Sequence, residues 1–253
     1  MNPTSHAALV TGGGSGLGAA TAEALAEAGC RVAVLDLNHT AATEVANRIG
    51  GLACLCDVTE PASATAAIAA ASAAHGPARI VVNCAGIATA GRVVGRDGPL
   101  PLDAFERVVR VNLFGTFNIL RLAAADMTTL DPLADGERGI IVNTASVAAF
   151  DGQIGQAAYA ASKGAIAAMT LPIARELARA GIRVLTIAPG LFMTPLLETL
   201  PPEVQQSLAA SIPFPARLGK PAEFAAMVLS LVQNSFMNGE TIRLDGALRM
   251  APK

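Results

Sequence analysis

The side chains best suited to acid–base chemistry surround the only tyrosine of the chain, Tyr159, which lies four residues before Lys163. At this spacing two side chains share one face of a helix. A lysine ammonium beside a phenol stabilises the phenolate and lowers a pKa that is ordinarily about 10. The pair therefore predicts an acid–base catalyst that works near neutral pH. The alternative interpretation is a tyrosine with an ordinary helical neighbour.

Two other polar residues fit the same chemistry. Ser146 lies in a loop of small residues that leads to the Tyr159 helix, and its hydroxyl would donate to a carbonyl oxygen. Taken alone, Ser146 would be interpreted as a helix cap. Asn112 interrupts the strongly helical run 103–127, and asparagine is a mediocre helix former, so we expect a polar role there.

A glycine-rich segment, TGGGSGLG at 11–18, separates the first predicted strand from a helix. Glycines permit a tight turn and let the backbone approach a pyrophosphate, which the amino terminus of the helix attracts. We therefore predict a dinucleotide site that includes Gly12, Gly16 and Gly18. The segment is not a P-loop, because no lysine follows it. A glycine-rich turn without a ligand is the alternative.

Asp36 ends the second predicted strand, where a dinucleotide-binding fold places an acid on the adenosine ribose. A carboxylate at this place would repel a 2′-phosphate, and no arginine or lysine lies at 12–18 or 37–40 to accommodate one. The sequence therefore favours NAD over NADP. Asp57 ends the third predicted strand in the same way, where it would meet the adenine. A turn cap is the alternative role for Asp36.

Apolar, β-branched runs alternate with alanine-rich helical stretches. The predicted strands are 7–10, 31–35, 52–56, 79–83, 139–143, 182–187 and 240–244, and the predicted helices are 17–28, 40–50, 61–75, 103–127, 157–180 and 221–233. This alternation predicts an α/β fold, a single-domain, Rossmann-like, doubly wound parallel sheet of about seven strands with helices on both faces. We expect a dinucleotide-binding part at 1–145 and a catalytic and substrate-loop part at 146–253. The long connections 84–102 and 188–220 are expected to be functional.

Composition excludes several classes of protein. Hydrophobic residues make up 52% and charged residues 15% of the chain, and the net charge is −2. These values exclude a disordered protein and argue against a nucleic-acid partner. We expect neither a secretory signal nor a membrane span. The four cysteines suit buried, reduced thiols in a cytoplasmic protein rather than a disulfide scaffold or a metal site.

Over nearly its whole length the chain resembles the short-chain dehydrogenase/reductase family. The resemblance is carried by the glycine segment, by NCAG at 83–86 and by PG at 189–190. It implies a catalytic set of Asn112, Ser146, Tyr159 and Lys163, in which Lys163 holds the nicotinamide ribose and Asn112 a water. It also implies that NAD is held by Gly12, Ser15, Gly16, Leu17, Gly18, Asp36, Asp57, Val58, Asn83, Cys84, Ala85, Gly86, Tyr159, Lys163, Pro189, Gly190, Phe192 and Thr194.

Blocks at 143–178, 182–197, 212–225 and 238–250 are similar to a narrower group within that family, the type 2 3-hydroxyacyl-CoA dehydrogenases. This resemblance implies hydride transfer between NAD and the 3-carbon of an acyl-CoA, with Gln153 and Gln156 joining Ser146 and Tyr159 at the substrate. The alternatives are a hydroxysteroid or other secondary-alcohol dehydrogenase, suited by the apolar segment 191–200, and a cofactor-binding scaffold. The family implies a homotetramer. Candidates for contact with CoA phosphates are Arg92, Arg96, Arg217 and Lys220.

Overall fold

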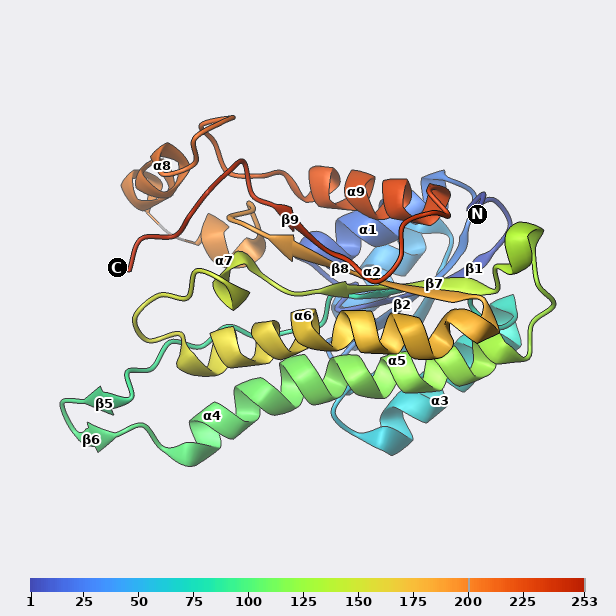
Figure 1. Cartoon of the computed structure of the whole chain (residues 1–253), viewed down its shortest axis with the longest axis horizontal. Helices are drawn as coiled ribbons and strands as arrows, with labels where there is room; N and C mark the ends of the chain where they lie inside the picture. Colours follow the sequence, from blue (N-terminus) through green and yellow to red (C-terminus); the bar gives the residue numbers. More distant parts are fainter. Residues whose placement is uncertain (200, 253) are drawn as a thin grey trace.

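The main sheet of the protein is parallel throughout. A computed structural model describes residues 1–199 and 201–252, so the last residue of the apolar segment 191–200 lies outside the description. Within the described residues, seven strands form this sheet in the order β3-β2-β1-β4-β7-β8-β9 (Figure 1). Their bounds are β1 Ala7–Thr11, β2 Arg31–Asp36, β3 Leu52–Leu55, β4 Ile80–Asn83, β7 Gly139–Thr144, β8 Ile182–Pro189 and β9 Thr241–Leu244. The predicted fold class and strands are confirmed.

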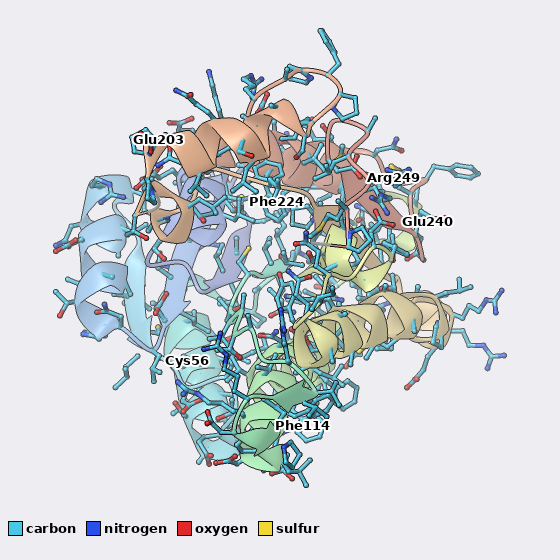
Figure 2. The ribbon with its side chains drawn as sticks, turned by 90° about the vertical axis from the view of Figure 1, so that its left-hand side faces the viewer. Cys56, Phe114, Glu203, Phe224, Glu240 and Arg249 are labelled. Carbon is cyan, nitrogen blue, oxygen red and sulfur yellow. The ribbon has the colours of Figure 1, made fainter. Side chains whose placement is uncertain are left out.

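Helices cover both faces of the sheet. On one face lie α1 (Gly16–Glu27), α2 (His39–Ile49) and α9 (Pro221–Gln233). On the other lie α3 (Pro61–His75), α4 (Leu102–Val109), α5 (Gly115–Thr128) and α6 (Ala157–Leu177). Each layer has its own hydrophobic core against the sheet. Phe224 of α9, with no exposed surface, lies inside the first of them (Figure 2).

The helix predicted at 103–127 is continuous through α4 and α5 but contains a π-helical turn at Arg110–Phe114. Asn112 lies in this turn, so the poor helix former coincides with a local change of helical geometry. Within the described residues, the combined helix Leu102–Thr128 is the one long and apolar enough to cross a membrane, and 50% of its apolar window is buried inside the protein. A helix that packs against a protein core passes the same test of length and composition, so this helix alone does not indicate a membrane span.

The two long connections contain short elements that the sequence analysis did not predict. Segment 84–102 forms a small antiparallel hairpin, β5 (Val94–Gly95) with β6 (Gly98–Pro99). Segment 188–220 contains α7 (Pro195–Glu198) and α8 (Pro202–Ala210). These elements are too short to show a hydrophobic period, which is the signal that sequence analysis relies on.

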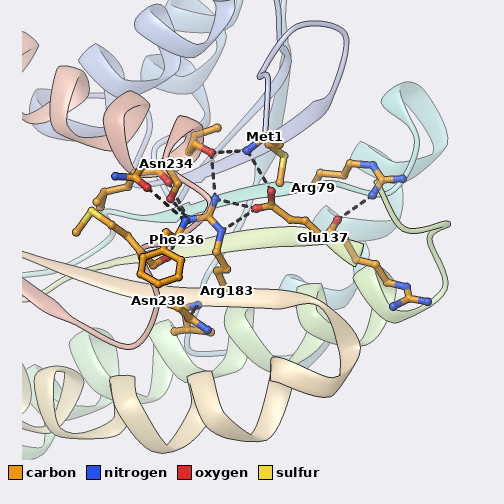
Figure 3. Close-up of polar contacts among 12 residues, drawn as sticks. Met1, Arg79, Glu137, Arg183, Asn234, Phe236 and Asn238 are labelled. Atoms are coloured by element: carbon orange, nitrogen blue, oxygen red, sulfur yellow. Dashed lines mark hydrogen bonds and ion pairs between the residues drawn. The ribbon is translucent and has the colours of Figure 1, made fainter. Parts of the chain in front are cut away.

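A buried ion pair lies at the amino-terminal edge of the sheet, away from the predicted site (Figure 3). The guanidinium of Arg183, at the start of β8, lies 2.7 Å from the carboxylate of Glu137, and both side chains are at most 8% exposed. The α-ammonium of Met1 lies 3.1 Å from the same carboxylate. The other guanidinium donors bind main-chain carbonyl oxygens at and beyond the end of α9, those of Leu231, Val232, Asn234 and Met237.

This ion pair makes a testable contribution to stability. Removing one member of a buried pair leaves the other charge without compensation, which costs about 3–5 kcal/mol. We expect Glu137→Gln to lower the free energy of unfolding by that amount, measured by urea denaturation.

The matched control is Glu23→Gln, which removes the exposed ion pair between Glu23 and Arg48, 2.7 Å apart. An exposed pair of this kind contributes below about 1 kcal/mol. Equal losses in the two variants would show that the buried pair has no special role.

Candidate active site

A cavity of about 870 Å³ opens at the carboxyl ends of the strands, on both sides of the junction between β1 and β4. The chain order reverses at this junction, and ligands of open α/β sheets bind at such a switch point. Most of the predicted site residues line the cavity: Gly12, Ser15, Gly16, Leu17, Gly18, Asp36, Asp57, Val58, Cys84, Ala85, Gly86, Ser146, Gln153, Gln156, Tyr159, Lys163, Pro189, Gly190, Phe192 and Thr194.

The glycine segment passes too close to its neighbours for side chains at two positions. Gly12 has a φ of +62°, and a Cβ there would lie 2.7 Å from the main-chain nitrogen of Ala85. A Cβ on Gly18 would overlap the carbonyl oxygen of Gly12. The turn therefore brings the amino terminus of α1 to the floor of the cavity, with no acidic side chain in the first turn of that helix. An anionic group is favoured at this place.

Asp36 and Asp57 lie at one end of the cavity. The Asp36 carboxylate accepts hydrogen bonds from the main-chain N–H of Gly14 at 2.9 Å and of Asn38 at 2.8 Å. These bonds hold the group rigidly against the glycine segment. Each carboxylate oxygen has a second lone pair, so Asp36 can still accept hydrogen bonds from the hydroxyls of a ligand.

Ser146 and Tyr159 both line the cavity at its other end, where the Ser146 hydroxyl is near enough to the Tyr159 phenol to lower its pKa. Ser146 follows β7 and caps a 3₁₀ turn at Val147–Ala149 by accepting from the N–H of Ala148 at 3.1 Å. Tyr159 stands in the first turn of α6. The sheet edge and the helix thus present two hydroxyls to one point, where a carbonyl oxygen of a substrate would receive two hydrogen bonds.

Lys163 stands one turn beyond Tyr159 on α6 and is only 5% exposed. Its ammonium donates to the carbonyl oxygen of Thr144 at 2.8 Å and lies 5.8 Å from the centre of the Tyr159 ring. An ammonium has three N–H donors, and in the described part of the chain this is the one hydrogen bond that it makes. Donors therefore remain for a polar group in the cavity.

The prediction that Lys163 lowers the pKa of Tyr159 is wrong for the protein alone. Burial raises the pKa of the Tyr159 phenol, and the hydrogen bond with Ser146 opposes this only in part. Burial also lowers the pKa of Lys163, to about 8. The ammonium is directed at the Thr144 carbonyl rather than at the phenol oxygen. At neutral pH Tyr159 therefore holds its proton and is set up as an acid.

Asn112 and Asn83, both predicted to be site residues, lie behind the cavity wall and do not line it. The amide of Asn112 donates to the Ile87 carbonyl oxygen at 2.9 Å and to the Ser162 hydroxyl at 3.0 Å, and accepts from the Ile87 N–H at 2.8 Å. Asn112 thus joins the segment after β4 to α6. Its implied contact with a water stays a prediction. Asn83 donates to Asn143 at 3.0 Å, which joins β4 to β7.

The basic residues proposed for CoA phosphates, Arg92, Arg96, Arg217 and Lys220, do not line the cavity. Arg217 forms an exposed ion pair with Glu223, 2.6 Å away, and Lys220 precedes α9. Arg217 is therefore a surface charge that is already paired and in contact with solvent. Contacts of Arg92, Arg96 and Lys220 with the phosphates of a CoA that extends out of the cavity stay a prediction.

Sequence analysis did not assign several cavity residues to the site. Some were within its reach, because Leu37, Thr59 and Ile87 follow strand ends. Arg107 on α4 and Met250 near the carboxyl terminus have no such signal, since only the packing of helix and tail brings them to the cavity. The others are Leu35, Cys56, Ala88, Val111, Thr144, Ala145, Val147 and Ala148. Leu191, Pro195 and Leu197 also line the cavity and belong to the apolar segment 191–200 that the sequence analysis proposed for the substrate.

The cysteines are free thiols that burial makes unreactive. Burial raises the pKa of Cys56 to about 12 and that of Cys84 to about 11, so neither is a thiolate at neutral pH. The described residues contain no group of three or more His, Cys, Asp and Glu side chains that could hold a metal ion.

The cavity suits a nicotinamide dinucleotide in each of its parts. The glycine segment and the start of α1 favour a pyrophosphate, Asp36 can accept from a ribose, and the free donors of Lys163 suit a second ribose. All three features line the same cavity as Tyr159 and Ser146.

Comparisons with known proteins agree with this geometry. The sequence pattern of the short chain dehydrogenase family matches residues 6–205. The 3-hydroxyacyl-CoA dehydrogenase type-2 of Bos taurus is 53% identical over 249 residues, 97% of this chain and 95% of that protein.

Solved structures are similar over the whole chain. The 3-hydroxyacyl-CoA dehydrogenase type-2 from Mycobacterium avium superposes with a TM-score of 0.93 at 42% identity, covering 98% of each chain. The 3-ketoacyl-(acyl-carrier-protein) reductase from Brucella melitensis, solved in complex with NADH, has a TM-score of 0.86 at 30% identity, covering 98% of this chain and 100% of that one. With the site geometry above, these matches show that the chain belongs to the short-chain dehydrogenase family and is a nicotinamide-dependent oxidoreductase.

Proposed function

We propose that the protein catalyses reversible hydride transfer between NAD and the 3-carbon of a 3-hydroxyacyl-CoA. The observation that carries the proposal is the Ser146–Tyr159 pair, which lines a cavity large enough for a dinucleotide. The chain is also more than half identical to a 3-hydroxyacyl-CoA dehydrogenase type-2. The Ser146 and Tyr159 hydroxyls can form hydrogen bonds with a substrate carbonyl oxygen and equally with the alcohol oxygen formed from it.

Asp36 supports NAD as the cofactor rather than NADP. Its carboxylate is fixed at the cavity wall by the Gly14 and Asn38 N–H groups. A 2′-phosphate placed here would meet this negative charge at close range. The adjoining residue Leu37 supplies no positive charge to offset it.

In the direction of reduction, Ser146 donates a hydrogen bond to the substrate carbonyl oxygen, and Tyr159 gives its proton to the same oxygen. Bound NADH supplies the hydride to carbon 3. The raised pKa of Tyr159 keeps the proton available for this transfer. Lys163 orients the cofactor ribose through its remaining N–H donors, and its charge stabilises the phenolate that the transfer leaves. In the oxidative direction the same phenolate accepts the alcohol proton.

The cavity wall beyond the catalytic residues supports an acyl substrate. Leu191, Phe192 and Leu197 provide an apolar surface there, while Gln153 and Gln156 offer amide groups. This surface also suits a sterol, so a hydroxysteroid or other secondary alcohol is the alternative substrate. The intact catalytic set argues against a role as a cofactor-binding scaffold alone.

We also propose that the protein is a cytoplasmic homotetramer. Phe114 at the end of the π-helical turn, Phe117 on α5 and Leu171 on α6 are between 43% and 54% exposed, which is costly for large apolar side chains in water. Figure 2 labels Phe114. The two helices lie side by side on the same face of the sheet (Figure 1). Their outer faces are suited to packing against a second copy.

The cytoplasmic location is supported by the cysteines. Four free cysteines fit a reducing compartment.

The substrate and cofactor are tested together. With acetoacetyl-CoA we expect the purified protein to oxidise NADH rapidly and NADPH at least about tenfold more slowly, because each 1.4 kcal/mol of repulsion at Asp36 costs a factor of ten. The absorbance of the reduced cofactor at its nicotinamide band gives both rates.

Tyr159→Phe is the control in this assay. It removes one hydroxyl, and with it the general acid, so we expect the NADH rate to fall by about 10²–10⁴-fold while NADH still binds. Turnover with NADPH alone would overturn the role of Asp36. Binding of NADH without any turnover of the thioester would favour a sterol or another secondary alcohol as substrate.

Cofactor affinity is expected to depend on pH through Lys163. Its pKa is lowered to about 8, so the ammonium is charged below that pH and loses its charge as the pH rises above it. We expect the Kd for NADH, measured by fluorescence titration, to rise between about pH 7.5 and pH 9.5. In Lys163→Arg the cation persists over this range, and the Kd is expected to change little. The same pH profile in both proteins would assign the titration to another group.

The assembly is expected to have about four times the 25.6 kDa mass of one chain in light scattering. Phe117→Glu places a charge on the outer face of α5 and is expected to yield smaller species with unchanged far-UV circular dichroism. Glu106→Ala, on the exposed part of α4, is the control and leaves the mass unchanged. A single-chain mass for the wild-type protein would refute the tetramer.

A further inference from the structure

The loop between Ser146 and Tyr159 is held by two segments that are far from it in the sequence. On one side, the N–H of Gly91 donates to the carbonyl oxygen of Gly155 at 2.8 Å, which attaches the segment before the β5–β6 hairpin. On the other, the carboxyl-terminal tail, residues 245–252, runs beside the loop. The N–H of Ile154 donates to the carbonyl oxygen of Pro252 at 3.0 Å, and the Gln153 amide donates to that of Ala251 at 3.0 Å.

Arg243, at the end of β9, ties the tail and the loop together. Its guanidinium lies 2.6 Å from the carboxylate of Asp151 in the loop and 2.7 Å from that of Asp245 at the start of the tail. It also donates to the carbonyl oxygen of Leu248 at 2.9 Å and lies 5.4 Å from the centre of the Phe150 ring. One side chain thus connects a strand end, the catalytic loop and the tail.

The apolar side chains of the tail belong to a small hydrophobic cluster beneath α7 and α8. Leu248 is 2% exposed and packs with Ile212 and Leu218. Met250 and Met193 are partly buried against the same cluster. The two methionines differ in one respect: Met250 also lines the cavity, and Met193 does not.

The position of Met250 along the cavity follows from its neighbours. The next residue, Ala251, accepts the hydrogen bond from Gln153, and Gln153 lines the cavity within the Ser146–Tyr159 loop. Met250 therefore stands at the catalytic end, whereas Asp36 stands at the other. A methionine side chain is long, unbranched and adaptable, so its removal enlarges a cavity without breaking a hydrogen bond.

We propose that Met250 is a specificity-determining residue, whose side chain limits the size of the acyl group that fits beyond the reacting carbon. Arg243 and the tail hold it in place against the catalytic loop. The inference deepens the proposed function, because it assigns the wall that the acyl part of the substrate meets. The carboxyl terminus is then part of the active site rather than only a packing segment.

The test compares wild type, Met250→Ala and Met250→Phe with Met193→Ala as the matched control. The ratio of kcat/KM for 3-oxodecanoyl-CoA to that for acetoacetyl-CoA is measured with NADH. The same ratio is measured for a 17-oxosteroid against cyclohexanone. A change in pocket volume of a methylene or more shifts selectivity by about 10–200-fold. We therefore expect Met250→Ala to raise each ratio of larger to smaller substrate about tenfold or more, and Met250→Phe to lower it. Met193→Ala is expected to leave both ratios within about twofold of wild type.

The outcomes separate this inference from the proposed function. Opposite shifts in the thioester ratio for the two Met250 variants support both. Thioester turnover with unchanged ratios overturns the role of Met250 and leaves the proposed function standing. If only the ketones are reduced and their ratio shifts, the thioester proposal fails and the role of Met250 stands. A shift of equal size in Met193→Ala would also overturn the role of Met250, because loss of packing would explain both.

Discussion

Parallel hydrogen bonding of β1 to its two neighbours is the constraint on which the site depends. The register pairs Thr11 with Leu35 of β2 on one side and with Asn83 of β4 on the other. Three carboxyl ends therefore meet at one edge, and the glycine segment leaves β1 between the other two. With antiparallel neighbours, Asp36 and the segment after Asn83 would lie at the other edge of the sheet, away from the glycine segment. The cavity exists because all of these strands end at the same side.

Burial then sets the protonation states that catalysis uses. The Lys163 ammonium is buried on α6 with one carbonyl partner, so its charge is costly in the protein alone, and its pKa is lowered to about 8. A ligand that offers acceptors to this ammonium would relieve that cost. Tyr159 experiences the same surroundings with the opposite result, because burial favours its neutral, protonated form. The two residues thus need a bound cofactor to act as the pair that their spacing suggests.

The segments outside the sheet determine what the cavity accepts. The hairpin connection, helices α7 and α8, and the carboxyl-terminal tail all lie at the strand ends, near the loop between β7 and α6 (Figure 1). Hydrogen bonds between residues 153–155 and both the hairpin connection and the tail join these two segments to the loop that carries the catalytic hydroxyls. The fold as a whole is shared with a 3-hydroxyacyl-CoA dehydrogenase type-2 and with a 3-ketoacyl-(acyl-carrier-protein) reductase. At the opposite edge, Arg183 and Glu137 anchor β8 without contributing to the cavity.

The order of strands and helices along the chain, the fold class and most of the cavity lining could be predicted from the sequence. Alternation, glycine spacing and strand-end acids are local signals that each express one physical requirement, and the resemblance to the short-chain dehydrogenase/reductase family implied the other lining residues. The long helix predicted at 103–127 was also evident, but its π-helical turn at Asn112 was not. Three outcomes became evident only in the folded chain: Asn112 and Asn83 stand behind the wall, Arg107 and Met250 reach it, and burial raises the pKa of Tyr159. Those outcomes depend on burial and on contacts between residues far apart in the chain, for which a single sequence has no periodic signal.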